Sequence, residues 1–295
     1  MNIEQLERVR TGRGFIAALD QSGGSTSKAL KLYGLTESSY SNEAEMFDLV
    51  HEMRTRIIKS PVFKSDRILG VILFEMTMDR EIDGIGSAEY LWRKKGIVPF
   101  LKIDNGLLEE VNGVQLMKPI PQLMQRLQST KIHEVFGTKM RSVIKLANPI
   151  GIKTCLEQQF EFAGQVLQEG LIPIIEPEVD IDSPEKEASE TILKDSLHGH
   201  LDSLADTHSV ILKLSLPNEA GLYSALVSHP RVLRVVALSG GYPRDKANGL
   251  LAKNPNLIAS FSRALTEGLK FDQSQNEFEA ELDSSIQSIF EASVK

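Results

Sequence analysis

Short uninterrupted runs of apolar residues recur along the whole chain and form its clearest pattern. Such runs are typical of strands that are buried on both faces, as in a parallel sheet covered by helices. No two of the runs are joined by a hairpin turn. The pattern predicts eight strands, at Phe15–Leu19, Ile68–Phe74, Ile97–Leu101, Val135–Thr138, Leu171–Ile175, Val210–Leu214, Val232–Leu238 and Leu257–Phe261.

Between these runs the apolar positions follow a helical period. From Met46 to Ile57 apolar residues recur every three or four positions, and Asn42 and Glu45 before them resemble a capping pair. Similar patterns cover residues 152–167 and 278–290. The alternation predicts an α/β protein, and eight buried strands fit a closed (β/α)8 TIM barrel better than an open sheet. No linker rich in Pro, Gly or Ser divides the chain, so we expect a single domain over residues 1–295.

Composition narrows the class of protein. The 33 Lys and Arg against 40 Asp and Glu give a net charge of -7, without the basic excess expected of a nucleic-acid binder. No apolar run approaches the roughly 20 residues that span a bilayer. The N-terminal segment MNIEQLERVR lacks the apolar core of a signal peptide, and the single Cys155 cannot form an intramolecular disulfide. We therefore expect a cytoplasmic protein that binds neither nucleic acid nor membrane; the chain does not specify an oligomeric state.

Polar residues stand at the ends of the predicted strands, where a barrel of this kind carries its active site. Because the carboxyl ends of all eight strands meet at one mouth, we expect these side chains to converge. They are Asp20, Glu75, Lys102, Lys139 with Arg141, Glu176 with Glu178, Lys213, Ser239 with Gly240 and Gly241, and Ser260 with Arg263.

Lys213 is the most informative of these residues. The segment VILKLS places it within an apolar strand, where alternation directs it either into the barrel or onto the helix layer. Burial and a neighbouring cation favour the neutral amine, which is the form that attacks a ketone to give a Schiff base. Lys213 is therefore a candidate nucleophile. The alternative is a structural lysine paired with Glu176 or Glu178.

Three carboxylates are candidates for proton transfer near this lysine. In IIEPE, Glu176 and Glu178 lie on the same side of an extended chain, with Pro177 fixing the backbone between them. One carboxyl could exchange protons with a carbinolamine while the other orients it. The alternative is a cluster of salt bridges. Asp20 ends the first strand in the same way, and could instead cap the helix after Ser22.

Two late turns, SGGYPR at residues 239–244 and SFSRAL at residues 260–265, are candidates for phosphate binding. Barrels often bind phosphate in the loops after strands seven and eight, and Arg263 would add a charged fork. The alternative is that each turn only connects a strand to a helix. GGSTSK at residues 23–28 lacks the spacing of a nucleotide-binding loop, and the six histidines form no zinc motif. We expect neither a cofactor nor a metal.

Taken together, these segments resemble the class I fructose-bisphosphate aldolases, and in particular bacterial members of that family. The resemblance covers nearly the whole chain, through FIAALDQSGGS, GVILFE, VPFLKIDNG, FGTKMRS, GLIPIIEPE, VILKLS, VVALSGG and SFSRAL. It implies the barrel fold and a carbon–carbon lyase of glycolysis. The implied reaction is the reversible cleavage of fructose 1,6-bisphosphate to dihydroxyacetone phosphate and glyceraldehyde 3-phosphate, through a lysine Schiff base and without metal.

The resemblance also implies roles for five catalytic residues. Lys213 in VILKLS would form the Schiff base, and Glu176 in IIEPE would be the acid and base for the carbinolamine, with Glu178 beside it. Asp20 in FIAALDQS would orient the C4 hydroxyl for carbon–carbon cleavage. Lys139 in FGTKMRS would hold positive charge near Lys213 and help to keep it neutral.

The remaining implied positions bind a phosphosugar substrate. Ser239, Gly240 and Arg263 would bind phosphate, while Lys102 would help to position the sugar. The full set of implied binding residues is Lys102, Arg141, Ser239, Gly240, Ser260 and Arg263.

Two departures from the family accompany the resemblance. Ser262 stands where animal enzymes have Gly, which concerns the geometry of the phosphate loop. The final segment SIFEASVK lacks their C-terminal tyrosine, so exchange of the C3 proton falls to a residue in the barrel or to water. Two alternative functions stay open. One is a tagatose 1,6-bisphosphate aldolase, which differs only at C4. The other is a non-catalytic phosphosugar-binding barrel, which the presence of all the ionisable residues disfavours.

Overall fold

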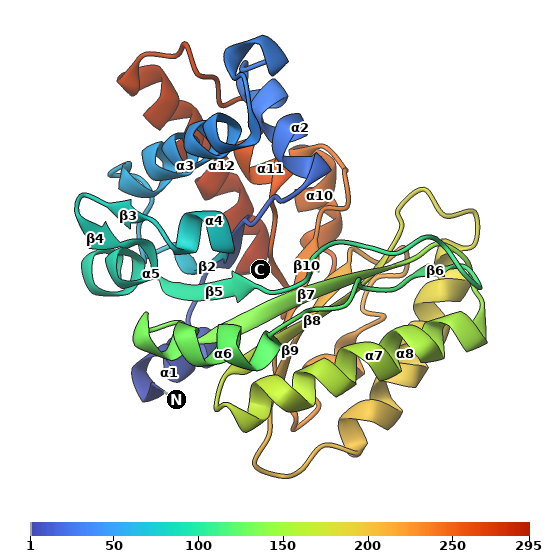
Figure 1. Ribbon diagram of the computed structural model, residues 1–295. Coiled ribbons are helices and arrows are strands. Elements are labelled where there is room, and N and C mark those ends of the chain that lie inside the picture. Colours follow the sequence, from blue (N-terminus) through green and yellow to red (C-terminus); the bar gives the residue numbers. More distant parts are fainter. Residues whose placement is uncertain (1) are drawn as a thin grey trace.

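The computed structural model describes the backbone of residues 2–295 and the side chains of these residues except 129, 131 and 132. Eight parallel strands form a nearly closed barrel with helices around it (Figure 1), which confirms the predicted (β/α)8 barrel. Neighbouring strands in the sheet follow the order β1 (Phe15–Leu19), β2 (Ile68–Phe74), β5 (Val98–Lys102), β7 (Gly137–Ile144), β8 (Ile172–Val179), β9 (Val210–Ser215), β10 (Val232–Leu238) and β11 (Ile258–Ala259).

Helices connect these strands on the outside of the barrel, and Figure 1 shows α7 and α8 lying along the outer face of β7 and β8. None of the helices over residues 2–295 is long and apolar enough to cross a bilayer. The α-helices are α1 (Ile3–Thr11), α2 (Gly24–Tyr33), α3 (Glu43–Lys59), α4 (Glu75–Met78), α5 (Ser87–Glu89), α6 (Leu123–Ile132), α7 (Pro149–Gln168), α8 (Lys186–Asp202), α9 (Ser224–Val227), α10 (Arg244–Leu251), α11 (Arg263–Thr266) and α12 (Gln275–Ser293). The three predicted helices correspond to α3, α7 and α12.

The segments between the barrel strands contain short elements that the sequence pattern did not predict. Strands β3 (Glu81–Ile82) and β4 (Ile85–Gly86) form a small antiparallel hairpin, and β6 (Val114–Gln115) pairs antiparallel with β7. The same segments also contain a 3-10 turn at Glu37–Ser39 and a π-helical turn at Tyr90–Lys94. The predicted capping pair is present, because the Asn42 side chain accepts a hydrogen bond from the Glu45 backbone N–H at 3.0 Å.

The bounds of three predicted strands were wrong. β7 and β8 continue to Ile144 and Val179, well past the predicted ends at Thr138 and Ile175. Their second halves carry charged residues, which hid them from a search for apolar runs, because alternate side chains there face the inside of the barrel. β11 is shorter than predicted and has only Ile258 and Ala259, since the chain turns into the following loop at Ser260.

The barrel closes between its first and last strands. The strand ladder of residues 2–295 ends at β11, and closure depends on a backbone hydrogen bond from Ala18 N–H to the Phe261 carbonyl at 3.0 Å. This seam therefore has fewer backbone hydrogen bonds than the long β7–β8 ladder, which pairs eight residues on each strand.

Apolar side chains fill the amino-terminal half of the barrel interior. Ile16, Phe100, Ile172 and Ile211 belong to one buried cluster together with Val9 of α1, so α1 closes this end of the barrel. The alternate residues of the same strands pack outward against the helices in a second and larger cluster. This period-2 division determines which side chains enter the barrel further along each strand.

Candidate active site

Alternation along the strands directs charged side chains into the carboxyl-terminal half of the barrel. In β8 the interior positions Ile172 and Ile174 are followed by Glu176 and Glu178, and in β9 the interior Ile211 is followed by Lys213. Lys213 therefore enters the barrel rather than the helix layer, and it is only 3% exposed. The apolar strands place an amine where little water reaches it.

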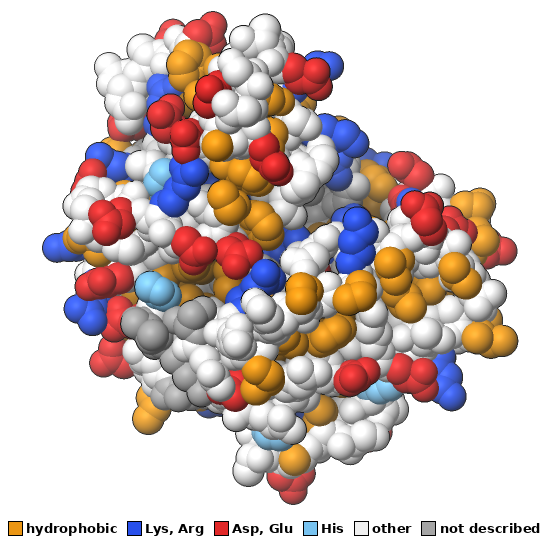
Figure 2. All heavy atoms as spheres, in the orientation of Figure 1, with side chains coloured by type: hydrophobic (Ala, Val, Ile, Leu, Met, Phe, Trp, Pro, Cys, Tyr) orange, Lys and Arg blue, Asp and Glu red, His pale blue; other side chains and the backbone are white. Residues whose placement is uncertain are grey.

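A cavity of about 500 Å³ opens at this end of the barrel and is visible near the centre of the face in Figure 2. All eleven catalytic and binding residues predicted from the sequence line it. They are Asp20, Lys102, Lys139, Arg141, Glu176, Glu178, Lys213, Ser239, Gly240, Ser260 and Arg263. The structure thus brings together residues from seven of the eight strands or from the loops that follow them.

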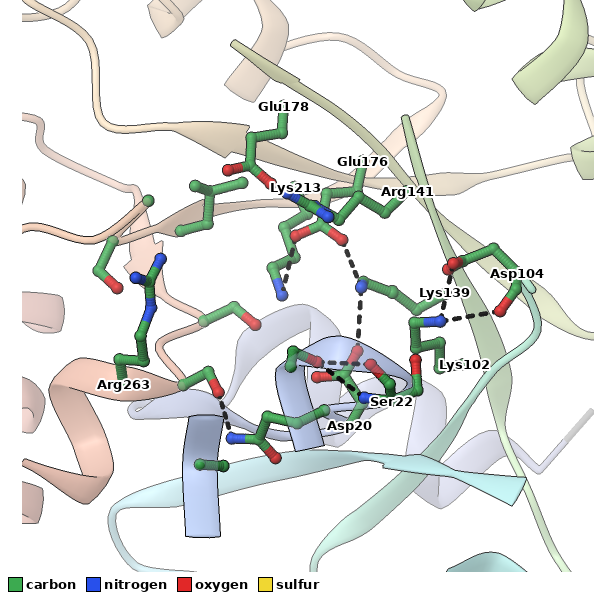
Figure 3. A pocket seen from close by; sticks show the side chains of 18 of the residues that line it. Asp20, Ser22, Lys102, Asp104, Lys139, Arg141, Glu176, Glu178, Lys213 and Arg263 are labelled. Carbon is green, nitrogen blue, oxygen red and sulfur yellow. Dashed lines mark hydrogen bonds and ion pairs between the residues drawn. The ribbon is translucent and has the colours of Figure 1, made fainter. Parts of the chain in front are cut away.

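Four of these side chains form a continuous chain of contacts at the floor of the cavity (Figure 3). Lys213 Nζ lies 3.1 Å from Glu176 Oε1, and Lys139 Nζ lies 2.6 Å from Glu176 Oε2. Lys139 Nζ also donates to Asp20 Oδ2 at 2.9 Å. Two lysines and two carboxylates therefore alternate, so that each neighbouring pair has opposite charge. Each of the four residues is less than a tenth exposed.

The charges of this chain stabilise one another against burial. Burial alone favours the neutral carboxyl of Asp20, but the positive charge on Lys139 and Lys213 outweighs it and holds the pKa of Asp20 well below its usual range. Burial likewise opposes the charge on Lys139, but Asp20 and Glu176 raise the pKa of this ammonium well above its ordinary value. Asp20 is thus a carboxylate and Lys139 a cation throughout the physiological pH range.

Glu176 is also fixed through its backbone. Its N–H donates to the side-chain carbonyl of Gln159 on α7 at 3.0 Å, in the buried layer between strand and helix. Across the β7–β8 ladder, Glu176 pairs with Arg141, whose side chain contacts the Glu178 carboxylate. Pro177 between the two glutamates keeps them on the same side of β8. Glu176 and Glu178 thus do form the ion pairs that the sequence analysis gave as the alternative to proton transfer. The same two carboxylates are also the candidates for proton transfer.

Lys102, the last residue of β5, has its own acidic partner. Its ammonium donates to Asp104 Oδ1 at 2.7 Å and to the Asp104 carbonyl at 2.8 Å. Burial lowers the pKa of Lys102, and Asp104 opposes that effect. The sequence analysis did not identify Asp104 as a site residue. Its position two residues after Lys102, in the segment FLKID, was the available signal, because alternation directs both residues to the same side.

The loops after β10 and β11 form one end of the cavity. Gly240 and Gly241 have φ values of 62° and 126°, a region that favours glycine, and a Cβ on Gly241 would lie 3.2 Å from the Arg263 guanidinium. Arg263 therefore lies directly over a bare backbone. Within residues 2–295 its guanidinium has neither a hydrogen-bond nor an ion-pair partner. The nearby Ser260 hydroxyl is buried without a partner among these same residues. Both groups are available to a ligand.

The loop after β1 lines another part of the cavity through Ser22, Ser25 and Lys28. The Ser22 N–H donates to the Ser25 hydroxyl at 2.9 Å, and this turn leads into α2. The sequence analysis considered GGSTSK only as a nucleotide-binding loop and missed this role. The signal that could have found it is position, because the segment directly follows the strand that ends in Asp20.

One expectation about strand ends was wrong, and one alternative that the sequence left open is excluded. Glu75 does not line the cavity; it begins α4, which turns the chain away from the mouth, and its carboxylate pairs with Arg126 at 3.1 Å in a separate hollow. Asp20 does not cap a helix either, since Gly23 is the cap residue of α2 and Asp20 faces Lys139. Across residues 2–295 we find no group of three or more His, Cys, Asp or Glu side chains that could hold a metal ion.

Comparison with known proteins places this arrangement in context. A family model for "Fructose-bisphosphate aldolase class-I" matches residues 4–218. The fold is similar to that of fructose-bisphosphate aldolase from Plasmodium falciparum, solved with TRAP and an inhibitor. That comparison has a TM-score of 0.75 at 19% identity and covers 99% of this chain and 94% of the other. A second structure, from Corynebacterium glutamicum, has a TM-score of 0.56 at 14% identity and covers 97% of this chain and 92% of that one.

Proposed function

Because the chain belongs to the class-I fructose-bisphosphate aldolase family, we propose that it cleaves fructose 1,6-bisphosphate to dihydroxyacetone phosphate and glyceraldehyde 3-phosphate in glycolysis, and forms the sugar in the reverse direction. Membership of the family supports a carbon–carbon lyase. The observation that carries the choice of mechanism is the buried chain Lys213–Glu176–Lys139–Asp20 at the cavity floor. It supports a Schiff base on Lys213.

Formation of the Schiff base requires a proton acceptor beside the amine. Glu176, 3.1 Å from Lys213 Nζ, takes a proton from the ammonium and leaves the amine free to attack the C2 carbonyl. A proton of the attacking nitrogen passes to the former carbonyl oxygen and gives the carbinolamine hydroxyl. The protonated Glu176 then gives its proton to this hydroxyl, which leaves as water, and the iminium and the Glu176 carboxylate remain. Lys139, 2.6 Å from the other oxygen of Glu176, stays a cation throughout these steps and holds Glu176 in place beside Lys213.

Cleavage of the carbon–carbon bond requires a base at the C4 hydroxyl. Asp20 is an ionised carboxylate that accepts a hydrogen bond from Lys139 at 2.9 Å, and this charge supports a role for Asp20 as the acceptor of the C4 hydroxyl proton. The C3–C4 bond then breaks, its electron pair moves into the iminium, and glyceraldehyde 3-phosphate leaves. A residue in the barrel or water protonates the resulting enamine at C3. One water molecule then hydrolyses the iminium, which releases dihydroxyacetone phosphate and regenerates Lys213, while Asp20 gives up its proton to solvent.

The charge of the cavity supports an anionic substrate with two phosphates. Although the chain carries a net charge of -7, basic side chains outnumber acidic ones around the cavity, and such a surplus attracts anions. Arg263 and Lys28, whose side chains have no hydrogen-bond or ion-pair partner within residues 2–295, provide cations for the phosphates, and Lys102 of β5 and Arg141 of β7 add positive charge elsewhere in the lining. The lining contains six basic side chains (Lys28, Lys102, Lys139, Arg141, Lys213 and Arg263) and four acidic ones (Asp20, Asp104, Glu176 and Glu178).

Borohydride reduction with dihydroxyacetone phosphate, followed by peptide mass mapping, tests the proposal directly. We expect an irreversible adduct on Lys213 and none in a Lys213→Met variant. An adduct on Lys102 or Lys139, or no adduct, would contradict the assignment. Assays with fructose and tagatose bisphosphates in parallel test the preference at C4. The same assays with EDTA test the metal-independent route, for which we expect unchanged turnover.

A further inference from the structure

A hydrogen bond between two side chains bridges the mouth of the barrel directly above its closing seam. Gln21, which follows Asp20, donates from Nε2 to the Ser262 hydroxyl at 2.6 Å, although the two residues are 241 positions apart. Ser262 precedes Arg263 and accepts this bond at the point where the chain leaves β11. The bond therefore joins the loop that begins at Asp20 to the loop that carries Arg263. It connects two strands that share little backbone pairing.

Gln21 is itself held from behind by a buried arginine. Arg54 of α3 is only 1% exposed and donates to the Gln21 carbonyl at 2.7 Å and to the Gln21 side-chain oxygen at 3.3 Å. Its other terminal nitrogen donates to the Thr77 hydroxyl at 2.7 Å. Burial lowers the pKa of this guanidinium to about 10, against the opposing effect of Asp20, so Arg54 is charged at neutral pH. Both ends of the Gln21 amide are thereby oriented.

The backbone around Ser262 explains how this contact reaches Arg263. Ser262 has a negative φ of -109°, so its backbone does not require glycine at this position. The next residue, Arg263, starts the short helix α11, and its guanidinium rests over Gly241 without a polar partner of its own among residues 2–295. The orientation of the guanidinium therefore depends on how firmly the preceding residue is held.

We propose that Gln21 is a positioning residue that, seated on Arg54, holds Ser262 so that Arg263 faces the phosphate-binding end of the cavity. Gln21 acts through Ser262 and makes no contact with the phosphate itself. The identity of that phosphate as part of a sugar bisphosphate rests on the proposed function. The positioning role does not, because inorganic phosphate probes the same guanidinium without turnover.

The test uses the full chain and four variants: Ser262→Ala, Ser262→Thr, Gln21→Ala and the Gln21→Ala/Ser262→Ala double variant. The midpoint for inorganic phosphate is measured from the rise in melting temperature at fixed ionic strength. A net hydrogen bond of ordinary strength corresponds to roughly a two- to tenfold weaker midpoint. We expect that loss in Ser262→Ala, Gln21→Ala and the double variant alike, with the wild-type midpoint in Ser262→Thr, which keeps the hydroxyl.

Turnover provides the second readout. In the three variants that lose the bond, we expect KM for fructose 1,6-bisphosphate to rise by the same factor while kcat stays within about twofold, because the Lys213–Glu176 pair is untouched. Wild-type phosphate midpoints in Ser262→Ala and Gln21→Ala would overturn the proposal. An additive loss in the double variant would also overturn it, since Gln21 would then act independently of Ser262. Failure of the wild type to cleave the sugar would instead contradict the proposed function. The phosphate midpoints would still test the positioning role of Gln21, because they require no turnover.

Discussion

The two ends of the barrel are built from the same strands on the same alternation, yet their interiors differ completely. Along β8 the inward-facing residues change from Ile172 and Ile174 to Glu176 and Glu178 within seven positions. The amino-terminal end is apolar and closed by α1, whereas the carboxyl-terminal end is charged and open to the cavity. The same regular strand therefore contributes an apolar layer that stabilises the fold and a charged layer that lines the cavity. The two layers are one inward-facing position apart, at Ile174 and Glu176.

The energetics of the two ends differ in kind. Removing apolar surface from water stabilises the amino end by about 25 cal/mol for each Å² buried. Charges at the carboxyl end cost free energy when they are desolvated, and only their mutual contacts offset that cost. The chain Lys213–Glu176–Lys139–Asp20 supplies those contacts without displacing the cavity. We expect mutations at the two ends to separate activity from stability, and four predictions test that separation.

The largest effect is expected for Glu176→Gln, which keeps the shape of the side chain and removes its proton-transfer function. General acid–base catalysis is typically worth about 100-fold to 10,000-fold in rate, so kcat for cleavage falls by that factor. KM changes little because the amide occupies the same space. Steady-state assays measure both constants, and Glu178→Gln serves as the matched control with a smaller loss. A variant with the parent kcat would show that Glu176 is a structural carboxylate.

The opposite pattern is expected at the amino end for Phe100→Ala. Phe100 is fully buried in the interior cluster, with its ring 5.6 Å from that of Phe136 in an edge-to-face arrangement. Loss of a buried phenyl group costs about 3–5 kcal/mol in the free energy of unfolding. Denaturant unfolding measures that loss, and kcat/KM per folded molecule stays at the parent value. Val111→Ala, at a position 65% exposed, is the control, with a change of at most about 0.5 kcal/mol. A fall in kcat/KM of folded Phe100→Ala would break the separation.

An intermediate effect on substrate recognition is expected for Arg263→Ala. Loss of one charged hydrogen bond costs about 1.5–3 kcal/mol, a reduction of roughly 10-fold to 150-fold in kcat/KM for the bisphosphate. Fructose 1-phosphate, with one phosphate fewer, is the comparison substrate at fixed ionic strength. Arg10→Ala removes the same charge from an exposed Glu7 pair and is expected to leave both specificity constants unchanged. Equal, near-unity effects of Arg263→Ala on both sugars would show that Arg263 makes no phosphate contact.

The smallest expected effect is a shift in the pH dependence of kcat/KM when Lys139 is replaced, since Lys139 contacts both Asp20 and Glu176. In the wild type the low pKa of Asp20 keeps this group ionised, so it contributes no loss of activity as the pH falls toward 4. Lys139→Met removes the nearest cation, so that only Lys213 and Lys102 still oppose the effect of burial, and the pKa of Asp20 rises. We expect the acid limb of kcat/KM to move to higher pH in Lys139→Met but not in Lys139→Arg. Coincident acid limbs in all three proteins would contradict this role for Lys139.

Much of the fold could be predicted from the local sequence pattern, because a strand that is buried on both faces consists of consecutive apolar residues. Each of the eight apolar runs overlaps a barrel strand, and the lysine inside the apolar segment VILKLS indicates the position of the cavity. The same rule failed where inward-facing charges broke the run, as in the second halves of β7 and β8. It also failed at Glu75, where the chain turns into α4 immediately after the strand.

The sequence by itself therefore determined the strands, their alternation and the residue types that reach the cavity, since these depend on neighbours along the chain. Tertiary structure alone decided which side chains meet. Lys139 contacts Asp20 across 119 positions, and Gln21 contacts Ser262 across 241, because barrel closure brings the first strand beside the last. Contacts between residues so far apart in the sequence depend on how the strands pack in space, and the local periodicity of a strand or helix does not predict them.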